Sequence, residues 1–299
     1  MVTGATKQEL ASSPVVIEAA ISPLRRDIPA QTTAELIAEA NSCLASGAGI
    51  VQHHHDNRLD AAASTQQLID VSEAVLAQHP SALMYTDYLP GRTAIDEYAN
   101  LQPMVEAGVL RMFAVDPGIT TFGSLDSEGL PTRTYTDGLK YSEVHELTMF
   151  AKKQNVPLSL GVFEPGQLRW IMAYEAKVGF PKGTLIKLYF GGRWMVDKVN
   201  TLGINFGLPP TTAALDVYLS MMEGSNLAWI TSVFGDAMLD SPIARHTLER
   251  GGHLRVGIED AAGQTTLTNA ELVTAAIALA TEVGRPVANG SNTLPALGA

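Results

Sequence analysis

Residues 47–55 read Gly-Ala-Gly-Ile-Val-Gln-His-His-His, an apolar run that closes in three consecutive histidines. A helical pattern of apolar residues precedes this run at 33–46, and a second one follows it at 65–78. An apolar run between two helices is typical of a strand in an α/β protein, where parallel strands are buried on both faces. The stretch therefore predicts one strand of a parallel sheet, with polar side chains at its carboxyl end.

The same alternation continues along the whole chain. Strand-like runs lie at 15–21, 50–55, 82–86, 109–115, 158–163, 185–190, 227–232 and 254–258. Helical patterns lie at 33–46, 65–78, 94–107, 141–153, 167–178, 211–222 and 237–250. Eight strands alternating with helices favour a single (β/α)8 TIM barrel over an open sheet. We expect one α/β domain over residues 1–299 with short terminal extensions, and a long βα loop at 117–137.

Composition narrows the classes of partner. Apolar residues make up 46% of the 299 residues, which suits a large core, and the net charge of −11 argues against nucleic acid or an anionic membrane as a partner. The sequence has no run of about 20 apolar residues and no apolar signal segment near Met1, so we expect a cytoplasmic protein. Its one cysteine, Cys43, lies in a helical pattern and is expected to pack in the core.

The three histidines are candidate metal ligands. Side chains two residues apart share one face of a strand, so His53 and His55 can point the same way. Imidazole is a common zinc ligand, and two of them leave room for a third ligand and an open position. The alternative is a solvated polar strand end that binds no metal.

A second polar group lies on the last predicted strand. Glu259 and Asp260 are adjacent, and Arg255 lies four residues before Glu259 on the same face. Asp116 follows the fourth strand. Because the carboxyl ends of barrel strands meet at one mouth, we expect these side chains to converge there. A purely structural ion pair that caps the barrel is the other interpretation.

The residues of this last strand carry a resemblance to a known family. Residues 253–260, His-Leu-Arg-Val-Gly-Ile-Glu-Asp, and residues 268–273, Thr-Asn-Ala-Glu-Leu-Val, resemble the carboxyl-terminal signature of the β-keto acid cleavage enzymes. Asp-Pro-Gly at 116–118 and Phe-Glu-Pro-Gly at 163–166 extend the resemblance over nearly the whole chain. It implies a zinc-dependent barrel that reacts a β-keto acid with acetyl-CoA, giving acetoacetate and a new acyl-CoA.

The resemblance also implies roles for residues. Glu259 would be a metal ligand, Asp260 the catalytic base, and Arg255 its partner and a substrate contact. The two histidine ligands of the family fall on Gln52 and His54 if the chain is aligned without a gap from the glycine at 47. Glutamine is a poor zinc ligand, and a one-residue bulge would bring the neighbouring histidines inward instead.

We therefore predict Zn²⁺, or another divalent metal, bound by His53, His55 and Glu259, with His54 as a ligand if the register has no gap. The expected assembly is a homo-oligomer, a dimer or a tetramer.

Substrate contacts are expected from the middle strands, at Thr86, Asp116 and Gly161. The best-known members of the family carry a glutamate on the fifth strand that looks suited to a cationic substrate, and the matching position here is Gly161, with Ser159 nearby. This difference predicts a neutral or anionic β-keto acid. Asp116 is the next candidate for the base if Asp260 is structural.

Two other functions stay open. The same barrel could be a metal-dependent aldolase, decarboxylase or hydrolase that does not use CoA, because one fold hosts many chemistries. A binding protein without catalysis is disfavoured, because ionisable groups clustered at a barrel mouth are costly without a role.

Overall fold

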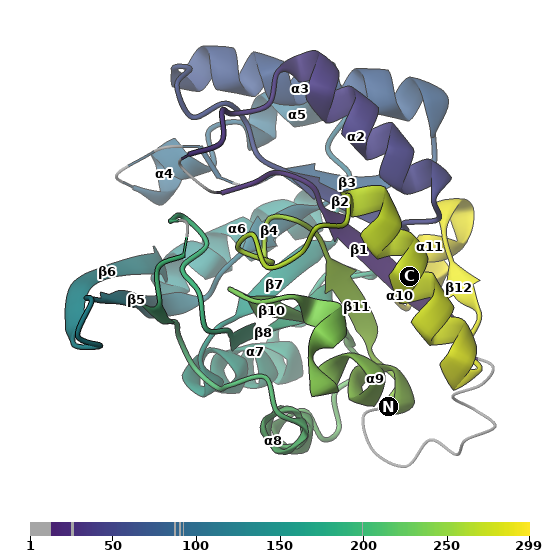
Figure 1. Ribbon diagram of the computed structural model, residues 1–299. Coiled ribbons are helices and arrows are strands. Elements are labelled where there is room, and N and C mark those ends of the chain that lie inside the picture. The colour runs from purple at the N-terminus through teal and green to yellow at the C-terminus, as the bar shows by residue number, and fades with distance from the viewer. Residues whose placement is uncertain (1–12, 25–26, 87, 90, 92, 199) are drawn as a thin grey trace.

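The computed structural model describes residues 13–24, 27–86, 88–89, 91, 93–198 and 200–299 (Figure 1). Within these residues, eight parallel strands form a nearly closed barrel. The strands are β1 (Val15–Ala20), β2 (Ile50–His53), β3 (Leu83–Thr86), β4 (Phe113–Val115), β7 (Leu158–Val162), β8 (Leu185–Gly191), β10 (Ala228–Phe234) and β11 (His253–Val256). They follow the order β3, β2, β1, β11, β10, β8, β7, β4, with the break in hydrogen bonding between β3 and β4. The predicted TIM barrel is confirmed.

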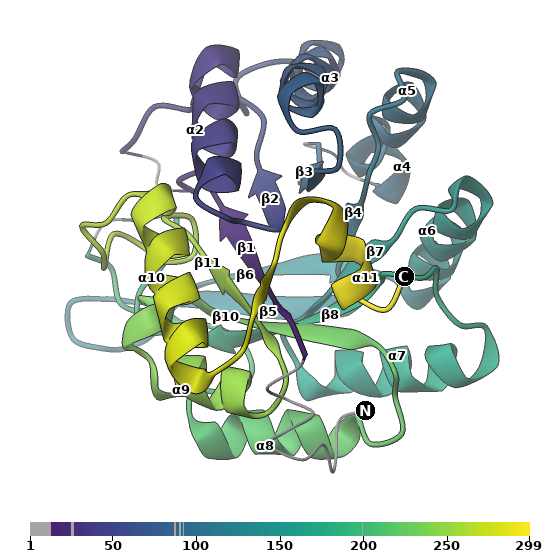
Figure 2. The same cartoon turned by 90° about the vertical axis from the view of Figure 1, so that its right-hand side faces the viewer.

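Helices surround the barrel, as the view along it shows (Figure 2). They are α2 (Thr33–Ala45), α3 (Ala61–Gln78), α4 (Ala94–Glu97), α5 (Leu101–Glu106), α6 (Tyr141–Gln154), α7 (Pro165–Lys177), α8 (Thr212–Met221), α9 (Pro242–Glu249), α10 (Asn269–Val283) and α11 (Thr293–Ala296), with short 3₁₀ turns η1 (Met238–Asp240) and η2 (Gly290–Asn292). The helix α10 follows the last barrel strand, a place where the sequence pattern had not predicted one.

Two predicted helices are interrupted. The pattern at 94–107 divides into α4 and α5, and the pattern at 237–250 divides into η1 and α9. Pro103 lies in the first turn of α5, and Pro242 is the first residue of α9. Proline has no N–H to donate and disfavours a helical residue before it, so a helix can begin at these points but not run through them.

The interior of the barrel is apolar at the amino-terminal end of its strands. Val16, Ile50, Leu185 and Ile230 pack there against Leu297 of the carboxyl-terminal segment. The strand β12 (Val287–Ala288) pairs with β1 at this end. This packing closes one end of the barrel and leaves the carboxyl ends of the strands for a site.

The segment 117–137, predicted as a loop, folds largely into an antiparallel hairpin of β5 (Gly118–Leu125) and β6 (Pro131–Leu139). The strand β9 (Gly203–Ile204) adds to β5, and the hairpin projects from the carboxyl-end face of the barrel (Figure 1). Gly138 is needed here, since its φ is +118° and an ideal Cβ would lie 1.9 Å from the carbonyl oxygen of Gly118. The loop prediction was wrong because the segment's Gly, Thr and Asp content hides the cross-strand pairing.

None of the helices in the described part of the chain is long and apolar enough to span a membrane. The number of domains stays a prediction, as does the cytoplasmic location.

Candidate active site

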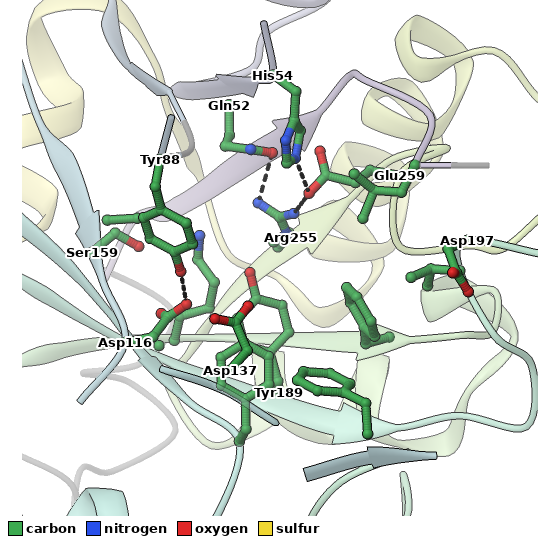
Figure 3. A pocket seen from close by; sticks show the side chains of 18 of the residues that line it. Gln52, His54, Tyr88, Asp116, Asp137, Ser159, Tyr189, Asp197, Arg255 and Glu259 are labelled. Carbon is green, nitrogen blue, oxygen red and sulfur yellow. Dashed lines mark hydrogen bonds and ion pairs between the residues drawn. The ribbon is translucent and has the colours of Figure 1, made fainter. Parts of the chain in front are cut away.

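A pocket of ≈ 570 Å³ opens at the carboxyl ends of the barrel strands, under the β5–β6 hairpin (Figure 3). This is the end at which TIM-barrel enzymes carry their active sites. The described residues that line it are Leu24, Gln52, His54, Asn57, Tyr85, Tyr88, Ala114, Asp116, Phe122, Tyr135, Asp137, Ser159, Gly161, Phe163, Lys187, Tyr189, Val196, Asp197, Phe234, Arg255 and Glu259.

The register of β2 decides which histidine faces this pocket. Its pairing runs without a shift through Gln52 with β1 and through His53 with β3, so the predicted bulge is absent. Side chains of an unbulged strand alternate, and Gln52 and His54 therefore share the inward face. The preferred set of His53 and His55 is corrected by this register, and the alternative with His54 is the one that the geometry supports.

The two other histidines point elsewhere. His53 is fully buried, with its Nδ1 3.3 Å from the carbonyl oxygen of His54. Burial lowers the pKa of His53 to about 4. His55 lines a neighbouring cavity together with Ser22 and Arg58. Among the described lining residues of the active-site pocket, neither His53 nor His55 is found.

Arg255 is the centre of a buried ion network at the base of the pocket. Its side chain is 1% exposed, and its Nη1 donates to Glu18 at 2.7 Å. Its Nη2 donates to Glu259 Oε1 at 2.6 Å and to Asp260 Oδ1 at 2.9 Å, and its Nε donates to Asp260 Oδ2 at 2.6 Å. A buried guanidinium is stable only with such partners, and the three carboxylates hold it in one orientation.

Asp260 lies behind Arg255 rather than on the pocket wall. Besides the guanidinium, its Oδ2 accepts a hydrogen bond from Ser232 Oγ at 2.5 Å, and the residue is 2% exposed. A turn after β11 brings the side chain back onto the arginine, since the strand ends at Val256. The predicted contact between Asp260 and Arg255 is present, whereas the role of Asp260 as base stays a prediction.

Gln52, His54 and Glu259 occupy the place expected for a metal. His54 Nε2 lies 3.2 Å from Glu259 Oε1. The Gln52 amide lies between two groups: in one orientation its oxygen accepts from Arg255 Nη1 at 3.3 Å, and in the other its nitrogen donates to Glu259 Oε2 at 2.6 Å. The amide and the carboxylate are therefore engaged in hydrogen bonds within the cluster.

This donor set does not fit the expected zinc site. Catalytic zinc takes three ligands from His, Cys and carboxylates, and an amide is a weak substitute. Over the described residues, no group of three or more His, Cys, Asp or Glu side chains is placed to hold a metal ion. Glu259 already accepts a charged hydrogen bond from Arg255. We therefore assign no catalytic step to a metal at this place.

A buried lysine was missed from the sequence. Lys187, on β8, lines the pocket, and its Nζ donates to Glu18 Oε1 at 2.6 Å and contacts the Tyr85 hydroxyl. Tyr85 also donates to Glu18, at 2.6 Å. Burial alone would raise the pKa of Glu18, but the charges of Lys187 and Arg255 bring it below its ordinary value. The signal was a single charged residue in each of two otherwise apolar strands, at Glu18 and Lys187.

The predicted substrate contacts divide. Asp116 and Gly161 line the pocket, but Thr86 does not lie among the described lining residues. Thr86 is buried, and its Oγ1 lies 3.4 Å from Asn100 Nδ2, while the preceding Tyr85 faces the barrel interior. The prediction for Thr86 is corrected because the strand's alternation turns it outward.

The pocket has a carboxylate near Gly161, although the glycine itself carries no side chain. An ideal Cβ at Gly161 would lie 1.9 Å from Asp116 Oδ1, so Asp116 fills the space of a side chain there. Tyr88 donates its hydroxyl hydrogen to Asp116 Oδ2. The reason for expecting an uncharged or anionic substrate therefore fails, and the charge of the substrate side chain stays untested.

Aromatic side chains form one wall of the pocket, and the Tyr189 ring lies beside Arg255, whose Cζ is 5.6 Å from the ring centre. Phe163 stacks on Tyr189 with ring centroids 4.5 Å apart, and Phe122 of the hairpin meets Phe163 edge-on at 6.0 Å. Phe206 and Phe234 extend the cluster. These rings come from segments far apart in the chain, and they give the pocket a dry side above the ionic base.

Comparisons with known proteins find one matching family and several structures of the same fold. The profile of a family described as beta-keto acid cleavage enzyme matches residues 14–298. A stretch of 101 residues is 36% identical to 3-keto-5-aminohexanoate cleavage enzyme of Acetoanaerobium sticklandii, covering 32% of this chain and 36% of that protein. The alignment thus spans about a third of the relative.

Solved structures show the same fold at low sequence identity. The ternary complex of ObcA with a C4-CoA adduct and oxalate has a TM-score of 0.66 at 11% identity, covering 90% of this chain and 67% of that one. The 3-dehydroquinate dehydratase from Geobacillus kaustophilus HTA426 has a TM-score of 0.52 at 10% identity, covering 89% and 92%.

Proposed function

Because the chain belongs to the β-keto acid cleavage enzyme family, we propose that it reacts a β-keto acid with acetyl-CoA in the pocket at the barrel mouth. The products would be acetoacetate and a new acyl-CoA. The observation that carries this proposal is Arg255, held by Glu18, Glu259 and Asp260 at the base of the pocket. Arg255 also lines the pocket, so its guanidinium, fixed in this orientation, can contact the carboxylate of a keto acid.

We assign each residue a role from its place in the pocket. Arg255 and Lys187 are the two cations at the base of the pocket, where they orient the acid group of the substrate. Three carboxylates pair with them, so the base as a whole carries no net positive charge. The aromatic wall around Phe163 and Tyr189 excludes water from the reacting carbon. Asp260 holds the Arg255 guanidinium in place and is the proposed base that takes the C2 proton, while Asp116 is the carboxylate that lines the pocket itself.

Zinc, implied by the resemblance, is not carried into this proposal, since an amide, an imidazole and an arginine-bound carboxylate stand where its ligands would be. A metal at this place would polarise the keto oxygen. Measuring the metal content of the purified protein shows whether zinc is bound, and this measurement does not depend on enzyme activity.

The test is to incubate the purified protein with acetyl-CoA and a panel of cationic, neutral and anionic β-keto acids, and to measure acetoacetate. Formation of acetoacetate that needs both substrates supports the proposal. Consumption of a keto acid without acetyl-CoA would instead favour a decarboxylase or hydrolase, and no reaction across the panel would contradict the proposal.

A further inference from the structure

Lys187 carries a buried amino group at the base of the active-site pocket. It lies in the middle of β8, its side chain is 3% exposed, and it lines the active-site pocket. Its Nζ lies 4.7 Å from the centre of the Tyr85 ring. An ammonium group inside a barrel is costly to desolvate, so its retention at the pocket indicates a role.

Lys187 lies next to a carboxylate that can accept a proton from its ammonium group. Glu18 Oε1 accepts from both Lys187, at 2.6 Å, and Arg255, at 2.7 Å, so one oxygen serves two cations. Among the described atoms, Glu18 Oε2 is buried without a hydrogen-bond partner. Glu18 is therefore placed to take up a proton from Lys187 transiently, although the two cations hold its own pKa below the ordinary value.

Burial eases the loss of a proton from Lys187. Burial lowers the pKa of Lys187, the charge of Glu18 opposes this, and the like charge of Arg255 adds to the lowering. Tyr189 and Asp260 are the other ionisable groups near it. A desolvated lysine next to a second cation is a known way of activating an amine toward a carbonyl.

The pocket still needs an electrophile. Cleavage of a β-keto acid passes through a carbanion next to the keto carbon, and Gln52, His54 and Glu259 do not supply the expected zinc set. We propose that Lys187 forms an imine with the keto group of the substrate and that this iminium takes the place of a metal as the electron sink. The identity of the substrate as a β-keto acid rests on the proposed function.

The step balances without an added reagent. The Lys187 ammonium gives a proton to Glu18, and the neutral Nζ attacks the keto carbon to form a carbinolamine. The keto oxygen leaves as water with two of the three ammonium protons, carried by Glu18 and the Tyr85 hydroxyl. The iminium keeps the third proton and the positive charge, which acidifies the C2–H. Addition of water reverses the step and frees the lysine.

Reductive trapping tests this directly. The full-length protein is incubated with acetoacetate and sodium cyanoborohydride, whose hydride converts an iminium into a stable secondary amine. We expect one reduced adduct per chain by intact mass, placed on Lys187 by peptide mapping. Lys187→Arg keeps the positive charge beside Glu18 but forms no imine, so it should remove the adduct. Lys182→Arg, at an exposed lysine near the start of the same strand, should leave the adduct unchanged.

The trapping experiment and the acetoacetate assay can fail independently, so they test the imine and the proposed function separately. An adduct on Lys187 without acetoacetate formation from acetyl-CoA would contradict the proposed function and support the imine. Acetoacetate formation with no adduct, or with adducts spread over exposed lysines, would overturn the imine alone. If Lys187→Arg fails to fold by circular dichroism, the peptide map of the wild-type protein decides by itself.

Discussion

Asp116 and Gly161 share one space: an ideal Cβ at Gly161 would lie 1.9 Å from Asp116 Oδ1. The two residues come from the ends of neighbouring parallel strands, β4 and β7, which pair from Phe113 to Val115. The absence of a side chain at 161 is therefore what allows the Asp116 carboxylate to point into the pocket. From the sequence alone, Gly161 looks like the loss of a carboxylate. In the structure, the same glycine makes room for the carboxylate of Asp116 from the neighbouring strand.

Gly161→Ala should move the Asp116 carboxylate away from Tyr88. The carboxylate is the end of a short side chain that can rotate, so we expect little change in Tm. We expect kcat/KM to fall about 10- to 100-fold, since a misplacement of about 1 Å can cost about 10²-fold. Gly166→Ala is the matched control, because an added Cβ there has no neighbour within 4 Å. Equal effects of the two changes would count against the shared-space account.

His54→Ala should lower activity, whereas His53→Ala should lower stability. His54 contacts Glu259 at 3.2 Å in the pocket, so its loss should lower kcat/KM about 10- to 150-fold, the equivalent of about 1.5–3 kcal/mol for a hydrogen bond to a charged group. His53 is buried on the other face, so its loss should lower the free energy of unfolding by about 1–3 kcal/mol and leave kcat/KM nearly unchanged. Steady-state kinetics and urea unfolding measure both. A loss of kcat/KM in His53→Ala but not in His54→Ala would favour the bulged register, in which His53 faces the pocket.

Asp260→Asn should lower kcat by about 10²–10⁴-fold, the usual contribution of a group that controls a proton in the transition state. The amide keeps the shape and the hydrogen bond with Ser232, so circular dichroism should show an unchanged fold. Asp116→Asn measured in parallel shows which carboxylate takes the C2 proton. A kcat of Asp260→Asn within a few-fold of wild type would leave Asp260 a structural partner of Arg255.

His253 makes stability depend on pH. Burial, with a smaller effect of the Arg285 charge, lowers its pKa to about 3 in the folded protein, from the ordinary value of 6.5. The unfolded chain therefore binds the proton more readily. The contribution of the neutral imidazole is complete above pH 6.5 and is lost as the pH falls from there toward about 3. We expect His253 to contribute about 1.4 kcal/mol per pH unit to the slope in this window, in addition to the contribution of His53.

Urea unfolding between pH 7 and pH 4 measures this slope. His253→Gln, which keeps an acceptor for the Val16 N–H that bonds to Nδ1 at 3.0 Å, should reduce the slope by about one proton. An unchanged slope in the variant would assign the dependence to other groups.

The sequence by itself determined the barrel. Eight apolar runs separated by helical patterns are local signals, and a parallel sheet of that length has few ways to bury both faces. The sequence also placed Arg255, Glu259, Asp116 and Gly161 at the pocket, because the carboxyl ends of parallel strands meet there whatever the details of packing.

The tertiary structure decided the facing of the side chains and the long-range pairs. A shift of one residue turns every side chain of a strand to the opposite face, so the choice between His54 and its neighbours depended on the pairing of β2 with β1 and β3. Glu18 and Lys187 are 169 positions apart and meet only when the barrel closes. The β5–β6 hairpin likewise depends on cross-strand hydrogen bonds, which single-strand composition does not reveal. Local periodicity thus determines the elements, while contacts between distant strands determine which groups can react together.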